Sequence, residues 1–447
     1  MYRYLKNYTD KVSCIINQGK QHGIKNFDIE QLKDVDILII VDSMNSAEDY
    51  QRLCDTETEI IVLDHHIIEE GVLDCPITLV SSANNYGNPQ LSGAGVCWKV
   101  CKYMDEQTLN NYADDLVDLA TCGIIADMCE VGLENAENRA ICNLGFNHQV
   151  NLGIKKINGS YEFNAQAISF GIATLVNAAC RTFQNEKALQ LFISDDVKEV
   201  NKLIRELKSA KERQNEAIIP ILEDIDMQYQ LQKDSKVLLF LIESDLDIAG
   251  LIGNKLLERY QRPLFVLRHK ADRFSGSARG IGVDNFKKYV DDVGLAVANG
   301  HEQAFGVDFA EQDKDVLIEE LNTALKDVEF VNERDVDVEI SANQITPQLI
   351  KTFKKINKVS GAGFKPLNVV IKDITEYTVG TMSNGKHLKI VCENFTAIKW
   401  NYTGDIDEFG DGIDNKRLSF VGQLDANYFG KTYTMQLIID DYKVEDI

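Results

Sequence analysis

Two continuous apolar runs, each ending in side chains that can bind a metal ion, constrain the fold of this chain most strongly. Residues 35–42 read VDILIIVD and end at Asp42, and residues 59–66 read EIIVLDHH and end at Asp64-His65-His66. Continuous runs of valine, isoleucine and leucine of this length are typical of strands buried on both faces of a parallel sheet. Open α/β sheets bind ligands beyond the carboxyl ends of their strands. The sequence therefore predicts an α/β domain that brings Asp42 and the triplet to one edge of a sheet.

The Asp-His-His triplet is the first candidate for a metal site. The alternative interpretation is a solvated polar turn, but the chain has only 7 histidines in 447 residues, so an adjacent pair is uncommon by chance. A further acid, Asp127, follows the apolar helical segment LATCGIIA, although an acid in that place most often caps a helix. Clustered carboxylates and imidazoles suit Mn²⁺ or Mg²⁺, and two such ions about 3.5–4 Å apart can activate water for attack on phosphorus.

The first α/β region continues through helical patterns over residues 92–104 and 111–127. The segment 185–225 then predicts one long connector helix with an apolar stripe and a charged opposite face. Its stripe consists of Val197, Val200, Leu203, Ile204 and Leu207.

A second α/β unit is predicted from a strand at 236–244, a helix at 247–259 and a strand at 263–269. Beyond about residue 335 the segments become short, rich in β-formers and separated by Gly, Asn or Asp. This spacing predicts a small barrel or sandwich.

Composition excludes some classes of protein and favours a reducing compartment. The formal net charge of −23 argues against non-specific binding to polyanions. Residues 262–280 nevertheless carry five Arg or Lys against one acid, which predicts either a phosphate-binding patch or an ordinary basic surface loop. No apolar run approaches the length of a membrane span, and the ten cysteines show no CxxC pair. We therefore expect a cytoplasmic protein with free thiols and no membrane partner.

The order of these segments resembles the DHH phosphoesterase family, and within it the RecJ-type single-strand-specific exonucleases. Asp42 in VDSMNS matches the second motif of the family, and Asp64-His65-His66 matches the third, which names it. The segment LSGAGVCWKV (91–100) resembles a helix-opening segment, and 115–139 resembles the fourth motif, with Asp127 as its acid. The segment SFGIATLVNAACRTF (169–183) is similar to the Asn-Ala…Arg segment of the family.

The later regions extend the resemblance over nearly the whole chain. FSGSARG (274–280) and NGHEQAFGVDF (299–309) resemble the DHH-associated domain, and 356–440 resembles an OB-fold domain. Asn299 replaces the usual first glycine of a Gly-Gly-His loop. The resemblance implies a parallel-sheet DHH-like domain lacking its N-terminal strand, a connector helix, a smaller α/β domain and a β-rich OB-like domain. The corresponding boundaries are 1–183, 184–228, 229–332 and 333–447.

The resemblance also implies roles for particular residues. Metal ligands would be Asp42, His65 and Asp127, binding Mn²⁺ or Mg²⁺. Asp64 would orient or ligate nearby, and His66 would contact or protonate the scissile phosphate. Contacts to the phosphates of the strand would come from Asn177, Arg181, Ser275, Gly276, Ser277, Arg279, Gly300 and His301. Glycines let backbone N–H groups approach an anion, and an arginine offers a bidentate fork.

One motif of the family is not found. A complete member carries a first strand ending in a D-x-D-x-D-G-like motif, whose aspartates complete the second metal site. Asp34-Val35-Asp36 is the only D-x-D before Asp42, and it opens the strand that ends there, so it lies at the far end. Three explanations stay open: a split gene completed by a separate N-terminal polypeptide, an incomplete reading frame, or a relative that binds single strands without catalysis.

Three functions follow from these observations. The first is a metal-dependent 5′ to 3′ exonuclease of single-stranded DNA, serving repair, recombination or replication together with a single-strand-binding protein. The second is a non-catalytic or split-gene factor that binds single strands. The third, a hydrolase of short oligonucleotides or cyclic dinucleotides, is disfavoured because small substrates need neither a connector helix nor a β-rich C-terminal domain.

Overall fold

The computed structural model describes residues 1–447 except 20, 22, 331–334, 403, 411–415 and 430–431. The chain divides into two compact units. The first comprises residues 1–14, 22–174 and 334–447, and the second comprises 15–21 and 175–333. The four-domain division expected from the sequence stays a prediction.

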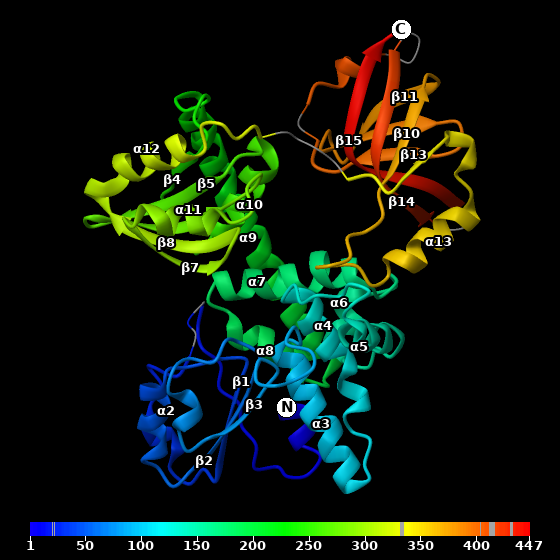
Figure 1. Cartoon of the computed structure of the whole chain (residues 1–447). Helices are drawn as coiled ribbons and strands as arrows, with labels where there is room; N and C mark the ends of the chain where they lie inside the picture. The colour runs from blue at the N-terminus through cyan, green and yellow to red at the C-terminus, as the bar shows by residue number, and fades with distance from the viewer. Residues whose placement is uncertain (20, 22, 331–334, 403, 411–415, 430–431) are drawn as a thin grey trace. The chain divides into compact units, whose positions relative to one another are not determined.

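A parallel three-stranded sheet organises the first unit, as the two apolar runs predict. Its strands are β1 (Ile37–Val41), β2 (Glu59–Asp64) and β3 (Thr78–Ser81), in the order β1-β2-β3. Val41 pairs with Leu63, so both runs end at the same edge of the sheet. The helices α2 (Ala47–Cys54) and α3 (Gly93–Thr108) flank this sheet (Figure 1).

The sequence predicts that β1 and β2 are both buried on both faces of the sheet, and this prediction is wrong for β1. The side chains of β2 are mostly buried, but Ile37 is 50% exposed and Val41 is 43% exposed. The reason is topological, because β1 lies at the edge of the sheet among the described strands.

Helices complete the α/β part of the first unit. They are α1 (Tyr2–Leu5), α4 (Val117–Ala126), α5 (Ala136–Asn147), α6 (Leu152–Asn158) and a π-helical turn at Ala167–Ile172 that leads into α7 (Ala173–Arg181). The predicted helix at 111–127 therefore begins later than expected, after a 3₁₀ turn at Asp114–Leu116. Ser92 caps α3 by accepting a hydrogen bond from the Gly95 N–H at 3.1 Å.

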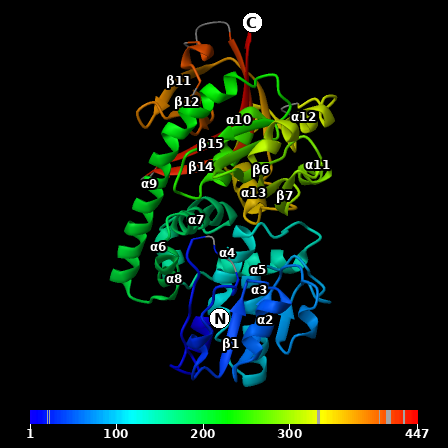
Figure 2. The same ribbon diagram turned by 90° about the vertical axis from the view of Figure 1, so that its left-hand side faces the viewer.

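The second unit contains two helices where the sequence predicts one. These are α8 (Asn185–Ile193) and the long α9 (Val197–Gln230), which Figure 2 shows in green. Asp196 caps α9 by accepting from the Glu199 N–H at 2.8 Å, so the first helix must end before it. Val197 belongs to the first turn of α9 and is 47% exposed, unlike the other four residues of the predicted stripe, which are buried.

The sheet of the second unit has five strands in the order β4-β5-β6-β8-β7. Its strands are β4 (Leu238–Leu241), β5 (Leu264–Lys270), β6 (Arg273–Arg279), β7 (Ala296–His301) and β8 (Ala304–Ala310). Its helices are α10 (Ala249–Tyr260), α11 (Phe286–Val293) and α12 (Lys314–Ala324). β4 and β5 are parallel, as expected for a second α/β unit, and the remaining pairs are antiparallel.

The C-terminal part of the first unit is β-rich, as predicted. Its seven-stranded sheet has the order β11-β12-β13-β15-β14-β10-β9. The strands are β9 (Val338–Ile340), β10 (Val369–Ile374), β11 (Tyr377–Met382), β12 (His387–Cys392), β13 (Thr396–Lys399), β14 (Lys416–Phe429) and β15 (Thr432–Asp446), and α13 is Pro347–Asn357. A buried apolar cluster of described residues fills this domain. Within the described ranges, no helix is long and apolar enough to cross a membrane.

Candidate metal and nucleic-acid sites

The carboxyl ends of β1 and β2 and the end of α4 bring three candidate ligands together. His65 Nε2 lies 3.2 Å from Asp42 Oδ1 and 3.4 Å from Asp127 Oδ2. The His65 side chain is largely buried, whereas those of Asp42 and Asp127 are half exposed, at 58% and 50%. The cluster is therefore open to solvent on its carboxylate side.

Asp64 organises the Asp-His-His triplet from inside the domain. Its fully buried carboxylate accepts the N–H groups of His65 and His66 at 2.7 and 3.3 Å. The same oxygen, Oδ1, lies 2.7 Å from His66 Nδ1 and fixes that imidazole ring. Asp64 Oδ2 is buried without a hydrogen-bond partner among the described residues. A buried carboxylate oxygen in that state is costly unless a cation or a proton compensates it.

These donors fit a divalent cation. Asp42, Asp64, His65 and His66 each offer a ligand atom, and the four atoms lie within 4.8 Å of one another. Oxygen-rich sites with an imidazole suit Mn²⁺ and Mg²⁺, and the orphaned Asp64 oxygen gives a buried negative charge that a cation would neutralise.

Backbone strain lies at one of the acids that contact His65 and directly after the other. Asp42 has φ 54°, and Met128, directly after Asp127, has φ 55°. Residues other than glycine rarely adopt this left-handed conformation, and such strain concentrates at functional sites. Gly93, the first residue of α3, packs against Asp42 so closely that a Cβ there would lie 2.2 Å from Asp42 Oδ1.

Hydrogen bonding and burial set the proton affinities of the cluster. The hydrogen bond with Asp42 raises the pKa of His65, and that with Asp64 raises the pKa of His66. Burial raises the pKa of Asp127. Each shift favours the protonated form of a group that must lose its proton to bind a metal, so protons compete with a cation for these atoms.

A cysteine that the sequence reasoning missed also belongs to this cluster. The Cys129 thiol donates to Asp127 Oδ2 at 3.6 Å, and its side chain is 6% exposed. Burial and the charge of Asp127 raise its pKa to about 12. Its spacing, two residues after the candidate acid, is the only signal of it in the sequence.

The segment after Asp127 is held from two sides. The Asn138 side chain donates to the carbonyl of Glu130 at 2.9 Å, and Arg139 donates to the carbonyl of Val131 at 2.9 Å. The Arg139 guanidinium also lies 4.6 Å from the ring centroid of Phe364, in the segment that leads into the C-terminal domain. These contacts fix the backbone that presents the acid.

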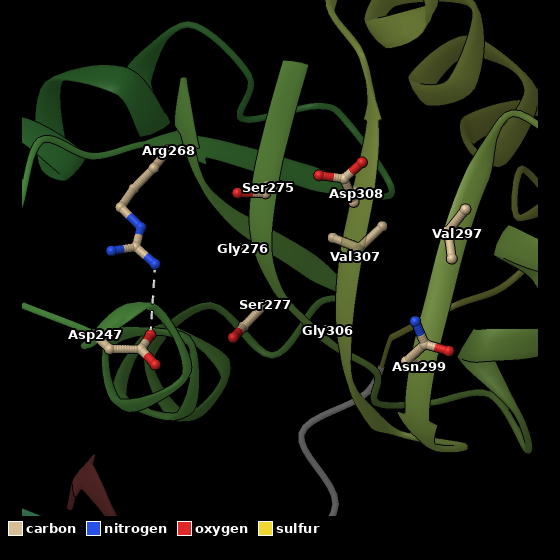
Figure 3. Close-up of a pocket in the computed structure, with 10 residues that line it drawn as sticks. All are labelled: Asp247, Arg268, Ser275, Gly276, Ser277, Val297, Asn299, Gly306, Val307 and Asp308. Carbon is tan, nitrogen blue, oxygen red and sulfur yellow. Dashed lines mark ion pairs between the residues drawn. The ribbon is translucent and has the colours of Figure 1, made fainter. Parts of the chain in front are cut away.

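In the second unit, three of the predicted phosphate-binding residues line a hollow of about 250 Å³ (Figure 3). Ser275 and Ser277 project from β6 toward the side where Arg268 and Asp247 lie. Gly276 between them is required, because a Cβ there would lie 2.1 Å from the Val266 carbonyl oxygen of β5. The other lining residues are Val297, Asn299, Gly306, Val307 and Asp308.

The expected basic patch at 262–280 is partly neutralised. Arg273 forms an ion pair with Asp308, and Arg268 lies 3.6 Å from Asp247. Arg262 donates to backbone carbonyls, at 2.8 Å to that of Ser235. Two of these arginines thus lie beside acids and the third is bonded to backbone carbonyls, so the phosphate-binding patch stays a prediction.

Arg279 does not line the hollow but packs on α10. It donates to Asn254 Oδ1 at 2.5 Å and to the Gly250 carbonyl at 3.2 Å. Burial and the charge of Arg181 lower the pKa of Arg279, and burial lowers that of Arg181. Arg181 is therefore near enough to Arg279 to act on it electrostatically, while the charge of Asp247 acts on Arg181 in the opposite direction to burial.

The remaining predicted residues lie on the surface of the second unit. Asn177 is exposed one helical turn before Arg181 on α7. Gly300 (φ 132°) and His301 are exposed at the end of β7 and do not line the hollow, whereas Asn299, which replaces the usual glycine, does.

Comparisons with known proteins support the resemblance. The model for the DHH family, N-terminal domain, matches residues 1–124, and that for the RecJ OB domain matches residues 336–441. The putative SPbeta prophage-derived single-strand DNA-specific exonuclease YorK of Bacillus subtilis (strain 168) is 28% identical over 96% of this chain and 80% of its own length.

RecJ proteins are similar over a smaller share of their length. The single-stranded-DNA-specific exonuclease RecJ of Bacillus subtilis is 27% identical over 87% of this chain and 51% of its own length. The crystal structure of RecJ in complex with Mn²⁺ from Thermus thermophilus has a TM-score of 0.74 at 21% identity, over 94% of this chain and 63% of that chain. This chain thus spans 51% of one RecJ and 63% of the other. The two domain matches and the curated relatives together support the resemblance of this chain to the DHH family and to its RecJ-type group.

Proposed function

We propose that this chain is a metal-dependent exonuclease that hydrolyses phosphodiester bonds of single-stranded DNA from the 5′ end, in repair, recombination or replication. The observation that carries the proposal is the position of His65 Nε2, which lies 3.2 Å from Asp42 Oδ1 and 3.4 Å from Asp127 Oδ2, in the same cluster as the unpaired buried oxygen of Asp64. The names of the relatives, which specify single-strand DNA exonucleases, support the substrate class. Two RecJ structures that contain Mn²⁺ and Mg²⁺ support these ions as cofactors.

Each residue of the cluster has a distinct role in this proposal. Asp42, His65 and Asp127 hold the cation, which when bound supplies a Lewis acid and an activated water. Asp64 holds His66 through Nδ1, so that the other ring nitrogen of this half-exposed histidine is available to the scissile phosphate. A histidine fixed by a carboxylate in this way keeps one tautomer and one orientation.

The second unit binds the phosphates of the strand. The paired cations Arg181 and Arg279 supply charge, and the hydroxyls of Ser275 and Ser277 supply hydrogen bonds. Further contacts come from Asn177, Gly276, Gly300 and His301. The β-rich domain adds stacking through Trp400, which is 50% exposed and lies edge-on to His387 at 4.8 Å.

Replacing Arg279 with alanine should weaken binding of single-stranded DNA about 10- to 100-fold, because hydrogen bonds to charged groups contribute about 1.5–3 kcal/mol. Fluorescence anisotropy with a labelled oligonucleotide measures this affinity. Arg259→Ala is the matched control, since Arg259 is on α10 but pairs with Asp226 at 2.6 Å. If the two variants bind single-stranded DNA equally well, Arg279 is not part of the strand-binding site.

Digestion of end-labelled single-stranded DNA tests the activity itself. With Mn²⁺, we expect the 5′-labelled strand to lose its label at once as a mononucleotide, and the 3′-labelled strand to give a ladder of shortened products. A chelator should stop both reactions, and duplex DNA should resist. A ladder from the 5′-labelled strand instead would reverse the proposed polarity, and cleavage that persists in the chelator would contradict the metal site.

A second candidate function is a single-strand-binding factor that cleaves only with a separately supplied polypeptide. It is favoured by β1, which ends directly before Asp42 and exposes Ile37 and Val41 at the edge of the sheet among the described strands. Edge strands of this kind can accept an added strand. Tight strand binding by this chain with no digestion in Mn²⁺ would select this function over the first.

A further inference from the structure

The cluster around Asp127 contains a soft donor that a site for Mn²⁺ or Mg²⁺ does not need. His65 Nε2, an Asp127 oxygen and Cys129 Sγ all lie within 4.8 Å of one another. The Asp127 Oδ2 atom is 3.4 Å from the imidazole nitrogen and 3.6 Å from the sulfur. Hard ions are bound by oxygen ligands, whereas thiolates select softer ions.

These separations match a tetrahedral thiophilic site. Zinc bonds of about 2.0 Å to nitrogen and oxygen and about 2.3 Å to sulfur place tetrahedral N and O ligands about 3.3 Å apart, and O and S ligands about 3.5 Å apart. The two distances in the structure differ from these by roughly 0.1 Å, and His65 Nε2 and Cys129 Sγ lie within 4.8 Å of each other. The fourth position of such a site is left to water, as at zinc sites with three protein ligands.

We propose that Cys129 makes this cluster a binding site for a thiophilic divalent cation such as Zn²⁺ or Cd²⁺. His65 Nε2, the Asp127 carboxylate and Cys129 Sγ are its ligands. On binding, the S–H bond is replaced by a sulfur–metal bond and the proton leaves to solvent, so no oxidant or reductant is involved. The half-exposed Asp127 side chain gives the ion a path from solvent to the buried sulfur.

The consequence is competition between two classes of ion for His65 and Asp127. An ion that is anchored by the sulfur occupies the ligands that the proposed nuclease reaction assigns to Mn²⁺ or Mg²⁺. The thiophilic ion should therefore inhibit digestion, and the inhibition should depend on Cys129. The binding itself does not rest on nuclease activity, so it can be measured in a chain that cuts nothing.

The test is a titration of the full chain with Cd²⁺, followed by the sulfur-to-cadmium charge-transfer absorption. We expect Cys129→Ala to lose the part of this absorption that one cadmium–thiolate bond contributes. Its affinity for Cd²⁺ should fall at least about tenfold. Cys142→Ala is the matched control, because Cys142 is a fully buried thiol on α5 of the same unit. His65→Ala, which keeps the thiol, should also weaken the site, and excess Mn²⁺ should displace Cd²⁺ from the parent.

Cys129→Ser separates ligation from support of Asp127. The serine hydroxyl keeps a hydrogen-bond donor but removes the sulfur, so we expect Mn²⁺ affinity to persist while the cadmium absorption is lost. An unchanged cadmium signal in both Cys129 variants, or an equal loss in Cys142→Ala, would overturn the inference. If the chain binds cadmium as expected but digests no DNA, only the proposed function is contradicted.

Discussion

Replacing His65 with alanine is expected to lower the rate of metal-dependent DNA digestion roughly a thousandfold or more, because the reaction loses the ligand that joins both acids. The Nε2 atom of His65 is the only atom that lies within 3.4 Å of both Asp42 and Asp127 among the ion pairs of the described residues. Without the imidazole, Asp42 and Asp127 would each lose the nitrogen that they share. The measurement is the initial rate of mononucleotide release in Mn²⁺, beside the affinity for Mn²⁺ from calorimetry.

The fold should survive this substitution. The hydrogen bond that Asp64 accepts from residue 65 comes from the backbone N–H and does not need the imidazole. His148→Ala is the matched control, because His148 also pairs with an acid, Asp115 at 2.9 Å, but is half exposed and outside the cluster. A His65→Ala variant that digests DNA as fast as His148→Ala would exclude the cluster as the catalytic site.

The sequence was sufficient to predict that these candidate ligands lie together, because the ends of parallel strands align. Parallel strands align their carboxyl ends, so Asp42 and the Asp-His-His triplet had to lie at one edge once both runs were assigned as strands. Asp127 follows α4, and the apolar pattern of that helix alone does not predict that Asp127 lies beside His65. The family resemblance supplied that placement, and the structure puts its carboxylate 3.4 Å from His65.

Other features depend on contacts that no local pattern encodes. The direction of Arg279 is set by α10, where a Cβ at Gly250 would come within 2.8 Å of its guanidinium. The exposure of β1 depends on its position in the strand order rather than on its own apolar sequence. The break between α8 and α9 had a readable signal, since Asp196 stands three residues before Glu199, but the apolar stripe concealed it.

Gly93→Ala should abolish most of the activity while leaving the protein folded, because it adds one methyl group directly against a metal ligand. The new Cβ would lie 2.2 Å from Asp42 Oδ1 and 2.7 Å from its Cγ, which no pair of real atoms tolerates. The Asp42 backbone has little room to adjust, since its N–H donates to the Leu63 carbonyl at 3.0 Å and its φ is already left-handed. The carboxylate must therefore turn away from His65.

The expected signature is a loss of function that is out of proportion to the change in stability. Alanine is a better helix former than glycine by up to about 1 kcal/mol, which offsets part of the steric cost at the start of α3. We expect the Mn²⁺ affinity to fall at least about tenfold and digestion about a hundredfold, with a shift in the melting temperature of only a few degrees. Gly87→Ala is the control, because Gly87 is exposed and a Cβ there would meet no atom within 4 Å. If Gly93→Ala binds Mn²⁺ as tightly as Gly87→Ala, Asp42 is not a ligand, and the cation must be held by His65 and Asp127 with the unpaired oxygen of Asp64.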